Sequence, residues 1–547
     1  MKTVLLSSLA KVFPECEPNY SEITQLSVLK NEGFSFQIAF MTEVEAEQNV
    51  KISVHSAFES GTETYLVKSI PAGKTSYDDS DVYYLNKKRK SYPDLLSPIE
   101  NGEVLSLRDT WSSVWVKVFP ESVTKAGTKK INITLKAGKS EIKKTLTVEV
   151  IDASLPEQTL LHTNWFHNDC LCTWYKVKPF STEYWEIVEN YIRNAVEHGV
   201  NMILTPIFTP PLDTEIGGER PTIQLVDVVK TDKDAYSFDF PNFRRYIKLC
   251  LDCGVKAFEI SHLFTQWGAL AAPKIVATVD GEEKTIFGWN TKAGSKAYVT
   301  FLTAFAGEFN KEVESLGIKE KCWLHVSDEP SLHQIGSYRR AAKILKELFP
   351  GYHTFDALSD FDFYKKGLIK TPVPNVGEAD VFYGKVEDFW TYYCCGQHKD
   401  FVPNRFFAMP SLRNRILGFL LYSYKAKGFL QWGYNFWYSQ YSKSKINPFK
   451  VTDAGGAFPS GDAFVVYPGE DRKPLNSLRF EVFAEGLQDL RALQLLESLS
   501  TRRYAKEVLL RDLDAPLSMN EYPHSTKWFL DKREEINAEI KQLISLR

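Results

Sequence analysis

The residues best suited to bond-breaking chemistry are the adjacent acids Asp328 and Glu329, in the stretch Ser327-Asp328-Glu329-Pro330. They directly follow the apolar run 322–326, which has the composition of a buried β-strand. An Asp-Glu dipeptide is often only a solvated loop. Two carboxyl groups at the end of a buried strand can, however, exchange protons with a bound substrate. Glycosidic cleavage commonly uses two carboxyl groups, one of which protonates the leaving oxygen.

The adjacency of the two acids favours one form of that reaction. Neighbouring residues approach a sugar from the same side, so they do not flank a glycosidic bond as two separate carboxylates do. They suit a substrate that carries its own nucleophile, the carbonyl oxygen of a 2-acetamido group. One acid then protonates the leaving oxygen, while the other hydrogen-bonds the acetamido nitrogen as an oxazolinium ring closes.

Aromatic and polar side chains at other expected strand ends are candidates for substrate binding. These candidates are Tyr392, Trp432, Asn435, Trp437, His262 and Trp267. Sugar-binding clefts favour flat rings, which pack on the apolar face of a pyranose, beside polar groups that hydrogen-bond its hydroxyls. The competing interpretation for any one aromatic is that it fills the interior, and a lone histidine is more often structural. Alternation puts Tyr392 and Tyr393 on opposite faces, and the sequence leaves open which of them faces the site.

The elements that must position these residues alternate between strand and helix. The expected strands are residues 160–165, 201–207, 255–260, 322–326, 353–357, 379–382, 389–394 and 428–434. Helical periodicity lies between them, in residues 183–198, 243–253, 297–316, 337–348 and 410–425. This order predicts an α/β fold, a (β/α)8 TIM barrel with its active site at the carboxyl ends of the strands. The alternative, an open doubly wound sheet, lacks its Gly-rich phosphate turn here.

The barrel is expected to occupy residues 156–475. Residues 1–155 show short alternating runs separated by turn clusters, which is typical of an N-terminal β-sandwich. Residues 476–547 begin with a strongly amphipathic stretch at 476–500 and predict a C-terminal helical segment packed on the barrel.

The amino-acid composition limits the classes of binding partner expected for this chain. The net charge of −3 argues against a nucleic-acid or polyphosphate partner, and the aromatic share of 14% leans towards carbohydrate. No run reaches the ~18 apolar residues of a membrane span, so no membrane partner is expected. Residues 3–10 imitate a short signal peptide but lack its cleavage site, and they are read as a first β-strand. A cytoplasmic enzyme is the resulting expectation.

The eight cysteines do not predict a metal site or a disulfide framework. Cys250 and Cys253 form a CxxC, but no second CxxC or spaced His pair accompanies them, and they lie in a helical run. Buried structural thiols are therefore expected, and no metal or cofactor is expected.

At these residues the sequence resembles glycoside hydrolase family 123, the β-N-acetylgalactosaminidases, over roughly residues 160–500. The resemblance rests on the Asp-Glu pair, on the aromatic stretches 390–396 and 432–437, and on a C-terminal signature in residues 467–469, 477–481 and 485–489. It implies that Asp328 stabilises the acetamido group and that Glu329 is the general acid. It also implies that Tyr392 donates to the acetamido oxygen and that Trp432 lines the pocket. The implied substrate is a glycan with a terminal 2-acetamido sugar.

Two alternatives remain open at this stage. An Asn-Glu-Pro motif after the fourth strand marks many retaining glycosidases that take a second Glu from the seventh strand. Here Asp328 replaces the Asn, and the only nearby acid of this kind, Glu387, precedes the seventh strand. The other alternative is a carbohydrate-binding protein without catalysis, in which the aromatic cleft is kept and the acids are structural.

Overall fold

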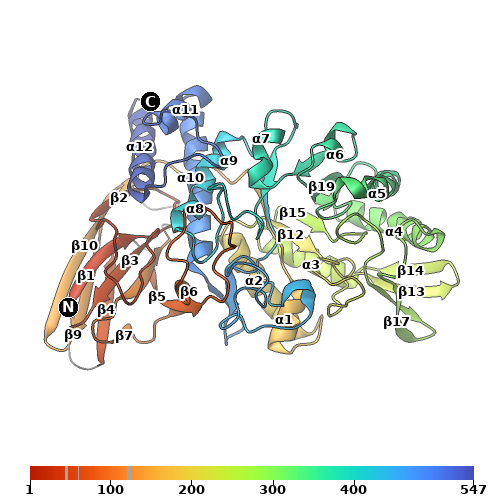
Figure 1. Cartoon of the computed structure of the whole chain (residues 1–547), viewed down its shortest axis with the longest axis horizontal. Helices are drawn as coiled ribbons and strands as arrows, with labels where there is room; N and C mark the ends of the chain where they lie inside the picture. The colour runs from red at the N-terminus through yellow and green to blue at the C-terminus, as the bar shows by residue number, and fades with distance from the viewer. Residues whose placement is uncertain (44–46, 59–60, 120–124, 547) are drawn as a thin grey trace.

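The computed structural model of the chain describes residues 1–43, 47–58, 61–119 and 125–546. Figure 1 shows β-sheets formed by the N-terminal part of the chain on one side and a barrel on the other. The long helix α10 runs between them. The chain thus changes from mostly antiparallel sheets to alternating strands and helices, as the sequence predicts.

Two five-stranded sheets make up the N-terminal part. In order across the first sheet, the strands are β1 (Lys2–Ser7), β3 (Phe34–Met41), β8 (Ser112–Val118), β5 (Thr62–Pro71) and β6 (Ser91–Pro98). Across the second they are β2 (Gln25–Leu29), β10 (Ser140–Ile151), β9 (Gly127–Ala137), β4 (Gln48–Ser56) and β7 (Glu103–Ser106). Alternate residues of β9, among them Ile131 and Ile133, are buried. Side chains of both sheets form one apolar core, so the sheets pack face to face.

The barrel consists of eight strands that pair in parallel. They are β11 (Leu161–Asn164), β12 (Met202–Thr205), β15 (Ala257–Ile260), β18 (Cys322–Leu324), β19 (His353–Ala357), β20 (Thr371–Val373), β21 (Trp390–Tyr392) and β22 (Gly428–Gln431). Between β20 and β21 the pairing is reduced to one bridge, between Asn375 and Tyr392. There the Tyr392 N–H donates to the Pro374 carbonyl oxygen at 3.0 Å, which closes the barrel.

Helices follow the strands and cover the barrel. They are α1 (Asn168–Tyr175), α2 (Thr182–Glu197), α3 (Pro241–Asp252), α4 (Lys296–Ser315), α5 (Ile335–Leu348), α6 (Asp362–Lys365), α7 (Ala379–Phe382), α8 (Ser411–Arg415) and α9 (Leu417–Ser423). Short 3-10 turns are η1 (Lys319–Lys321), η2 (Leu332–Gln334), η3 (Val376–Glu378) and η4 (Gln440–Ser442). Ser181 and Ser295 cap α2 and α4, because their side chains accept the free N–H groups of Tyr184 and Tyr298.

The sixth barrel strand is not where the sequence pattern puts it. Residues 379–382 were expected to be a strand but form helix α7, and the sixth strand is β20. Pro372 lies in the middle of β20 and lacks an N–H, so the segment does not read as a strand in sequence. Pro372 is tolerated within β20 because this strand pairs continuously only with β19.

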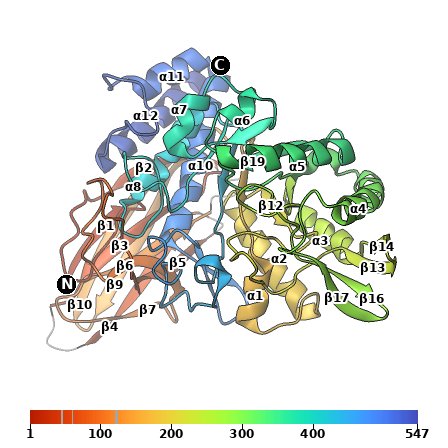
Figure 2. The ribbon, with the colours of Figure 1, turned by 45° about the vertical axis from the view of Figure 1, so that its right-hand side comes forward.

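A four-stranded sheet was not anticipated from the sequence. It contains β14 (Ala235–Asp239), β13 (Asp227–Asp232), β16 (Ile275–Val279) and β17 (Glu282–Phe287) in that order. Its strands come from the loops after β12 and β15. In both ribbon views it lies at the end of the molecule away from the N-terminal sheets (Figure 2).

The C-terminal helices join the two halves. They are α10 (Leu478–Leu499), α11 (Arg502–Leu510) and α12 (Thr526–Ser545), and a small hairpin of β23 (Val466–Pro468) and β24 (Pro474–Asn476) precedes them. On α8, Arg415 binds Glu485 and Asp489 of α10 at 2.6 and 2.8 Å. Arg533 of α12 binds the same Asp489 and also Glu32 of the N-terminal part. A buried charge network therefore holds sheets, barrel and C-terminal helices together. The domain limits expected from sequence stay predictions.

One connection of the N-terminal sheets also reaches the barrel. The segment 72–90 between β5 and β6 contacts the loops that follow β21 and β22. The Ser460 N–H donates to the Lys74 carbonyl oxygen at 2.7 Å, and Arg413 forms an ion pair with Asp81 at 2.7 Å. The Tyr77 ring lies 4.6 Å from the ring of His398. This connection is called the bridging loop below.

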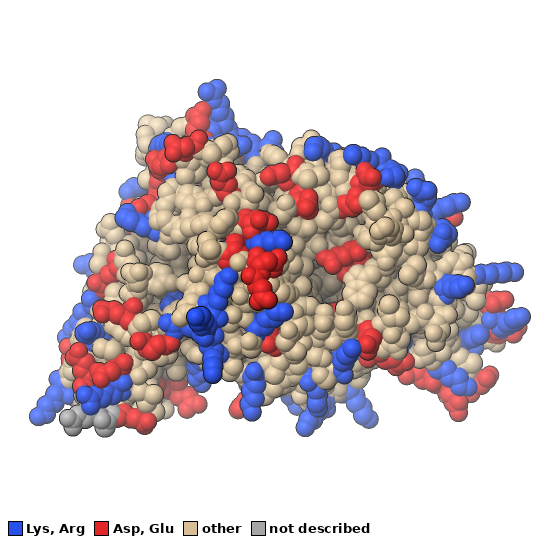
Figure 3. All heavy atoms as spheres, in the orientation of Figure 1, with Lys and Arg blue, Asp and Glu red and all other residues tan. Residues whose placement is uncertain are grey.

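The surface carries charges of both signs. On the face in Figure 3, basic and acidic side chains are interspersed around the edge, and acidic side chains gather near the centre beside a hollow. Within the described ranges, every helix is either too short or too polar to cross a bilayer.

Candidate active site

The Asp-Glu pair lies on a tightly held turn after β18. Ser327 fixes the start of the turn: its hydroxyl accepts the N–H groups of Gly268 and Ala269, each at 3.1 Å. The Trp267 N–H donates to the Asp328 carbonyl oxygen at 2.7 Å. The Glu329 N–H donates to the carbonyl oxygen of Ala357, at the end of β19, at 2.9 Å. Neighbouring strand ends thus determine where the two carboxyl groups lie.

Glu329 itself has an unusual backbone conformation. Its φ of 42° lies in the left-handed region, which costs free energy for a residue with a side chain. The hydrogen bond to Ala357 holds it there. Such strain is concentrated at functional sites in proteins, so this backbone conformation supports a functional role for the turn.

The Glu329 carboxyl group lines a recess of about 480 Å³ and is accessible from it. The lining residues are Glu329, Pro330, Leu358, Ser359, Asp360, Phe361, Glu378 and Tyr392. The Tyr392 hydroxyl donates to Glu329 Oε1 at 2.5 Å. The protein that surrounds the carboxyl raises the pKa of Glu329, and the Tyr392 hydrogen bond opposes that rise. A carboxyl with a raised pKa can hold a proton for transfer near neutral pH.

Asp328 is half-buried beside it and differs in its contacts. No hydrogen-bond donor from the described part of the chain reaches its carboxyl group, and Asp328 is not among the residues that line the recess. Burial raises the pKa of Asp328 well above its usual value, and repulsion from Glu329 raises it further. Burial raises the pKa of both acids, and because two neighbouring carboxylates repel each other, ionisation of one opposes ionisation of the other.

Two of the predicted aromatic residues are half-buried. The Trp267 ring lies 5.8 Å from the ring of Tyr441, edge to face. Trp432 packs against the apolar cluster inside the barrel, to which Tyr392 also belongs. Its indole N–H donates to Asp462 Oδ2 at 3.1 Å, and burial raises the pKa of Asp462 to about 7. The structure therefore brings Asp328, Glu329 and Tyr392 together, with Trp267 hydrogen-bonded to the same turn.

Three further predicted residues lie in the protein interior. Asn435 exchanges hydrogen bonds with the backbone of His167 at 2.8 and 3.1 Å. Trp437 donates to the Val466 carbonyl oxygen at 3.3 Å. His262 is completely buried against the ring of His325. None of these three lines the recess of Glu329.

The choice between the two adjacent tyrosines follows from their contacts. Tyr393 is buried on the outer side of the strand, where its hydroxyl donates to Asn414 Oδ1 at 3.1 Å. Tyr392 is the one that contacts Glu329.

A buried ionic cluster beside the acid pair was missed in the sequence. His325 lies between two carboxylates, with Nε2 2.5 Å from Glu259 Oε1 and Nδ1 3.0 Å from Asp356 Oδ1. Each of these residues is an isolated ionisable side chain within or next to an apolar strand run, which is the signal that could have identified them. We call Glu259, His325 and Asp356 the clamp.

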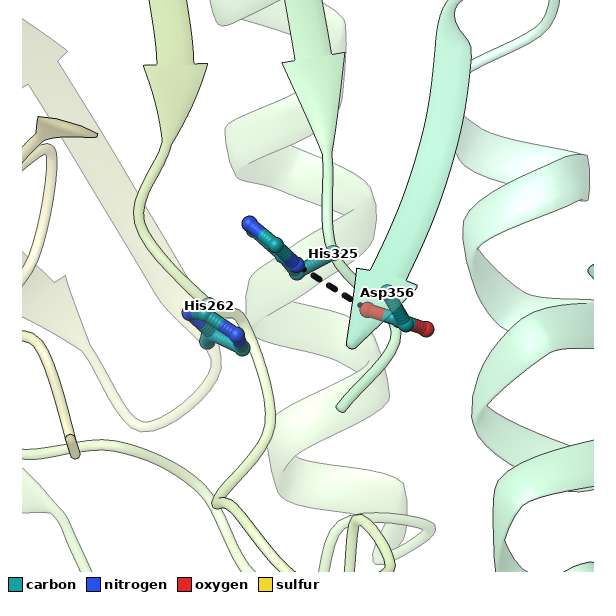
Figure 4. A group of neighbouring side chains, drawn as sticks. All are labelled: His262, His325 and Asp356. Atoms are coloured by element: carbon teal, nitrogen blue, oxygen red, sulfur yellow. Dashed lines mark hydrogen bonds and ion pairs between the residues drawn. The ribbon is translucent and has the colours of Figure 1, made fainter. Parts of the chain in front are cut away.

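His262, His325 and Asp356 also come close enough together to suggest a metal site (Figure 4). The two imidazole rings are stacked at 3.9 Å with an angle of 12° between their planes. Nitrogen lone pairs lie in the ring planes, so lone pairs of parallel rings cannot converge on one ion. Asp356 Oδ1 also accepts the backbone N–H groups of Val326 and Ser327. The group does not fit a metal.

An eight-stranded parallel barrel with a carboxyl pair, a recess and half-buried aromatic rings at its strand ends has the architecture of a glycoside hydrolase. The family model described as "Glycoside hydrolase 123, catalytic domain" matches residues 165–496, more than half of the chain. The chain belongs to glycoside hydrolase family 123, which confirms the resemblance seen in the sequence.

A solved structure with a high TM-score supports the same fold for this chain. A family 123 glycoside hydrolase from Clostridium perfringens aligns with a TM-score of 0.75 at 15% identity, covering 100% of this chain and 97% of that chain. A family 10 xylanase from termite gut reaches a TM-score of only 0.32 at 10% identity, covering 86% of this chain and 100% of that chain. A β-glucuronidase from Parabacteroides merdae has a TM-score of 0.33 at 10% identity, covering 83% of this chain and 50% of that chain. No curated protein sequence matches the chain.

Proposed function

We propose that the chain removes terminal β-linked N-acetylgalactosamine from glycans by a retaining mechanism that uses the 2-acetamido group of the substrate as nucleophile. The contrast between the two adjacent acids carries this proposal. Glu329 is held by Tyr392 and lines the recess, whereas Asp328 has a carboxyl group that no donor from the described residues reaches. A proton donor next to a free acceptor is what the reaction requires.

The proposed first step breaks the glycosidic bond. Glu329 gives its proton to the leaving oxygen while the acetamido carbonyl oxygen attacks the anomeric carbon. Asp328 accepts the acetamido N–H and offsets the positive charge of the oxazolinium ring. In the second step the Glu329 carboxylate takes a proton from water, which opens the ring and restores the β configuration. The enzyme returns to its starting protonation state, and one water is consumed.

Family membership supports a glycan substrate. The Clostridium perfringens structure was solved to describe glycolipid glycan hydrolysis, and a terminal N-acetylgalactosamine on such a glycan is the substrate we propose here.

A two-carboxylate mechanism would need a nucleophile besides the pair. Glu387 is exposed on the loop before β21 and does not line the recess. The other acids of the recess are Asp360, which accepts the Asp362 N–H at 3.0 Å, and Glu378, which is exposed on η3. A substrate panel separates the mechanisms. Chromogenic β-N-acetylgalactosaminide is expected to be cleaved best among β-GalNAc, β-GlcNAc, β-Gal and β-Glc substrates.

Hydrolysis is expected to depend on the 2-acetamido group. A thiazoline derived from N-acetylgalactosamine imitates the cyclic intermediate, so it should inhibit competitively and bind at least ~100-fold more tightly than the substrate. The measurement is the inhibition constant against an aryl β-N-acetylgalactosaminide. Efficient turnover of plain β-galactosides would contradict the substrate-assisted mechanism.

Tyr392→Phe is expected to lower kcat on the order of 10- to 100-fold, because the hydroxyl donates to Glu329 Oε1 and thereby positions that carboxyl group. Loss of a donor to the carboxylate raises the pKa of Glu329, so the alkaline limb of the kcat/KM profile should move to higher pH. Tyr393→Phe is the matched control, since its hydroxyl contacts Asn414. Equal losses of kcat in the two variants would contradict a role of Tyr392 in the reaction.

A further inference from the structure

The clamp is built from three buried side chains on neighbouring strands of the barrel. Glu259 belongs to β15, His325 follows β18 and Asp356 belongs to β19. Both nitrogens of His325 lie within hydrogen-bond distance of a carboxylate oxygen, at 2.5 and 3.0 Å. Carboxylates only accept, so both nitrogens must carry a proton. The geometry therefore identifies His325 as an imidazolium.

Other groups of the protein also donate hydrogen bonds to the two carboxyl groups of the clamp. Glu259 accepts the Trp165 indole N–H at 2.6 Å and the Thr163 hydroxyl at 2.5 Å. Asp356 Oδ2 accepts the Tyr338 hydroxyl at 2.6 Å. Burial alone would lower the pKa of His325, but the two carboxylates raise it to about 9.

His262 lies flat against His325 (Figure 4). Burial lowers the pKa of His262 well below its usual value, and the charge of His325 lowers it further, so this second ring is neutral. Neither of its nitrogens has a partner among the described residues. His262 presents a ring face to the imidazolium of His325 and forms no ion pair with the clamp.

The clamp is joined directly to the catalytic turn. Asp356 accepts the N–H groups of Val326 and Ser327, at 3.0 and 3.2 Å, and these residues lead into Asp328. The positive charge of His325 lowers the pKa of Asp328, whereas Glu329, Asp356 and Glu259 raise it. His325 is the only cation among these groups.

We propose that His325 is a positioning residue of the hydrolytic site, whose imidazolium, locked between Glu259 and Asp356, fixes the turn and supplies the countercharge that keeps one acid of the pair ionised. The inference rests on the proposed function, since that mechanism requires one ionised and one protonated acid at the same pH. Without the cation, four acids would share one end of the barrel interior, and the pair would hold both protons to a higher pH.

The test is the pH profile of kcat/KM for His325→Gln on an aryl β-N-acetylgalactosaminide. Glutamine keeps a donor for Glu259 but carries no charge. The acidic limb, which reports the ionised acid, should move up by about 1 pH unit. At the optimum kcat should fall on the order of 10- to 100-fold, with KM within about threefold. A purely structural role would lower the rate at every pH and leave the limb in place.

Asp356→Asn supplies a second test if His325→Gln does not fold. Asparagine keeps an acceptor for Val326 and removes one negative charge near Asp328, so the acidic limb should move to lower pH. His262→Phe is the matched control, because phenylalanine keeps the stacked ring and changes no charge. Its limb should coincide with that of the wild type. Limbs that stay in place in both clamp variants, or that move against these directions, would overturn the proposal.

The charge of His325 can also be tested without turnover. Its folded pKa of about 9 exceeds the ordinary value of 6.5, so its stabilising effect is complete below pH 6.5 and is lost as the pH rises through 9. The Tm of wild type should exceed that of His325→Gln by more at pH 6 than at pH 10. If the Tm difference between wild type and His325→Gln is no smaller at pH 10 than at pH 6, the result contradicts an imidazolium at His325. Failure of the wild type to cleave any N-acetylhexosaminide contradicts instead the proposed function.

Discussion

Glu329→Gln is expected to lower kcat on N-acetylgalactosaminides with poor leaving groups by ~10²- to 10⁴-fold, the usual contribution of a general acid. The amide keeps the size of the side chain, and it can accept from Tyr392 as Glu329 Oε1 does. It cannot give a proton to the leaving oxygen. The second step should suffer as well, because the same carboxylate activates the water.

The leaving group provides the internal control. Strongly activated aryl glycosides need little protonation in the first step, so their cleavage should be partly spared. The measurement is kcat/KM for wild type and variant on a series of aryl leaving groups of rising pKa, with the variant showing the steeper dependence. Equal and mild losses of kcat/KM across the series would contradict the role of Glu329 as general acid.

Asp328→Asn is expected to lower kcat at least ~100-fold with a much smaller change in KM. Asparagine keeps the size and some hydrogen bonding but removes the negative charge. Placed charge stabilisation in a site with little water is worth about 3 kcal/mol or more. The positive charge on the oxazolinium ring develops only on the way to the intermediate, so the loss appears in kcat.

The same substitution separates the two hydrolytic mechanisms. If Asp328 merely took the place of the Asn in an Asn-Glu-Pro motif, asparagine would be tolerated or even favourable. Kinetics of Asp328→Asn on an aryl β-N-acetylgalactosaminide decide this. A near-wild-type kcat would overturn the role of Asp328 and direct the search for a nucleophile to the other acids of the recess, Asp360 and Glu378.

Seven of the eight barrel strands could be predicted because each is an apolar run followed by turn residues. The exception, β20, contains Pro372 and has only three residues, so local pattern gives no sign of it. The sheet of β13, β14, β16 and β17 was missed for another reason. Its strands lie largely at the surface and come from two loops that are separate in sequence. Their pairing therefore depends on the tertiary fold, which local sequence pattern does not reveal.

The site was partly predictable for similar reasons. The acid pair could be found because adjacent residues stay adjacent in any fold. The pairing of Tyr392 with Glu329 depends on how the barrel closes between β20 and β21, which sequence spacing does not give. Asn435 and Trp437 follow the eighth strand in sequence, but the chain turns inwards there, and both are used for internal hydrogen bonds.

The bridging loop joins the N-terminal sheets to the catalytic half through specific contacts. Its contacts with the segments after β21 and β22 involve backbone hydrogen bonds and the buried Arg413–Asp81 pair, which an unrelated β-domain would not reproduce. Exchange of the sheets for another β-domain would therefore leave the Ser460 N–H and the Arg413 guanidinium without these partners on the barrel side.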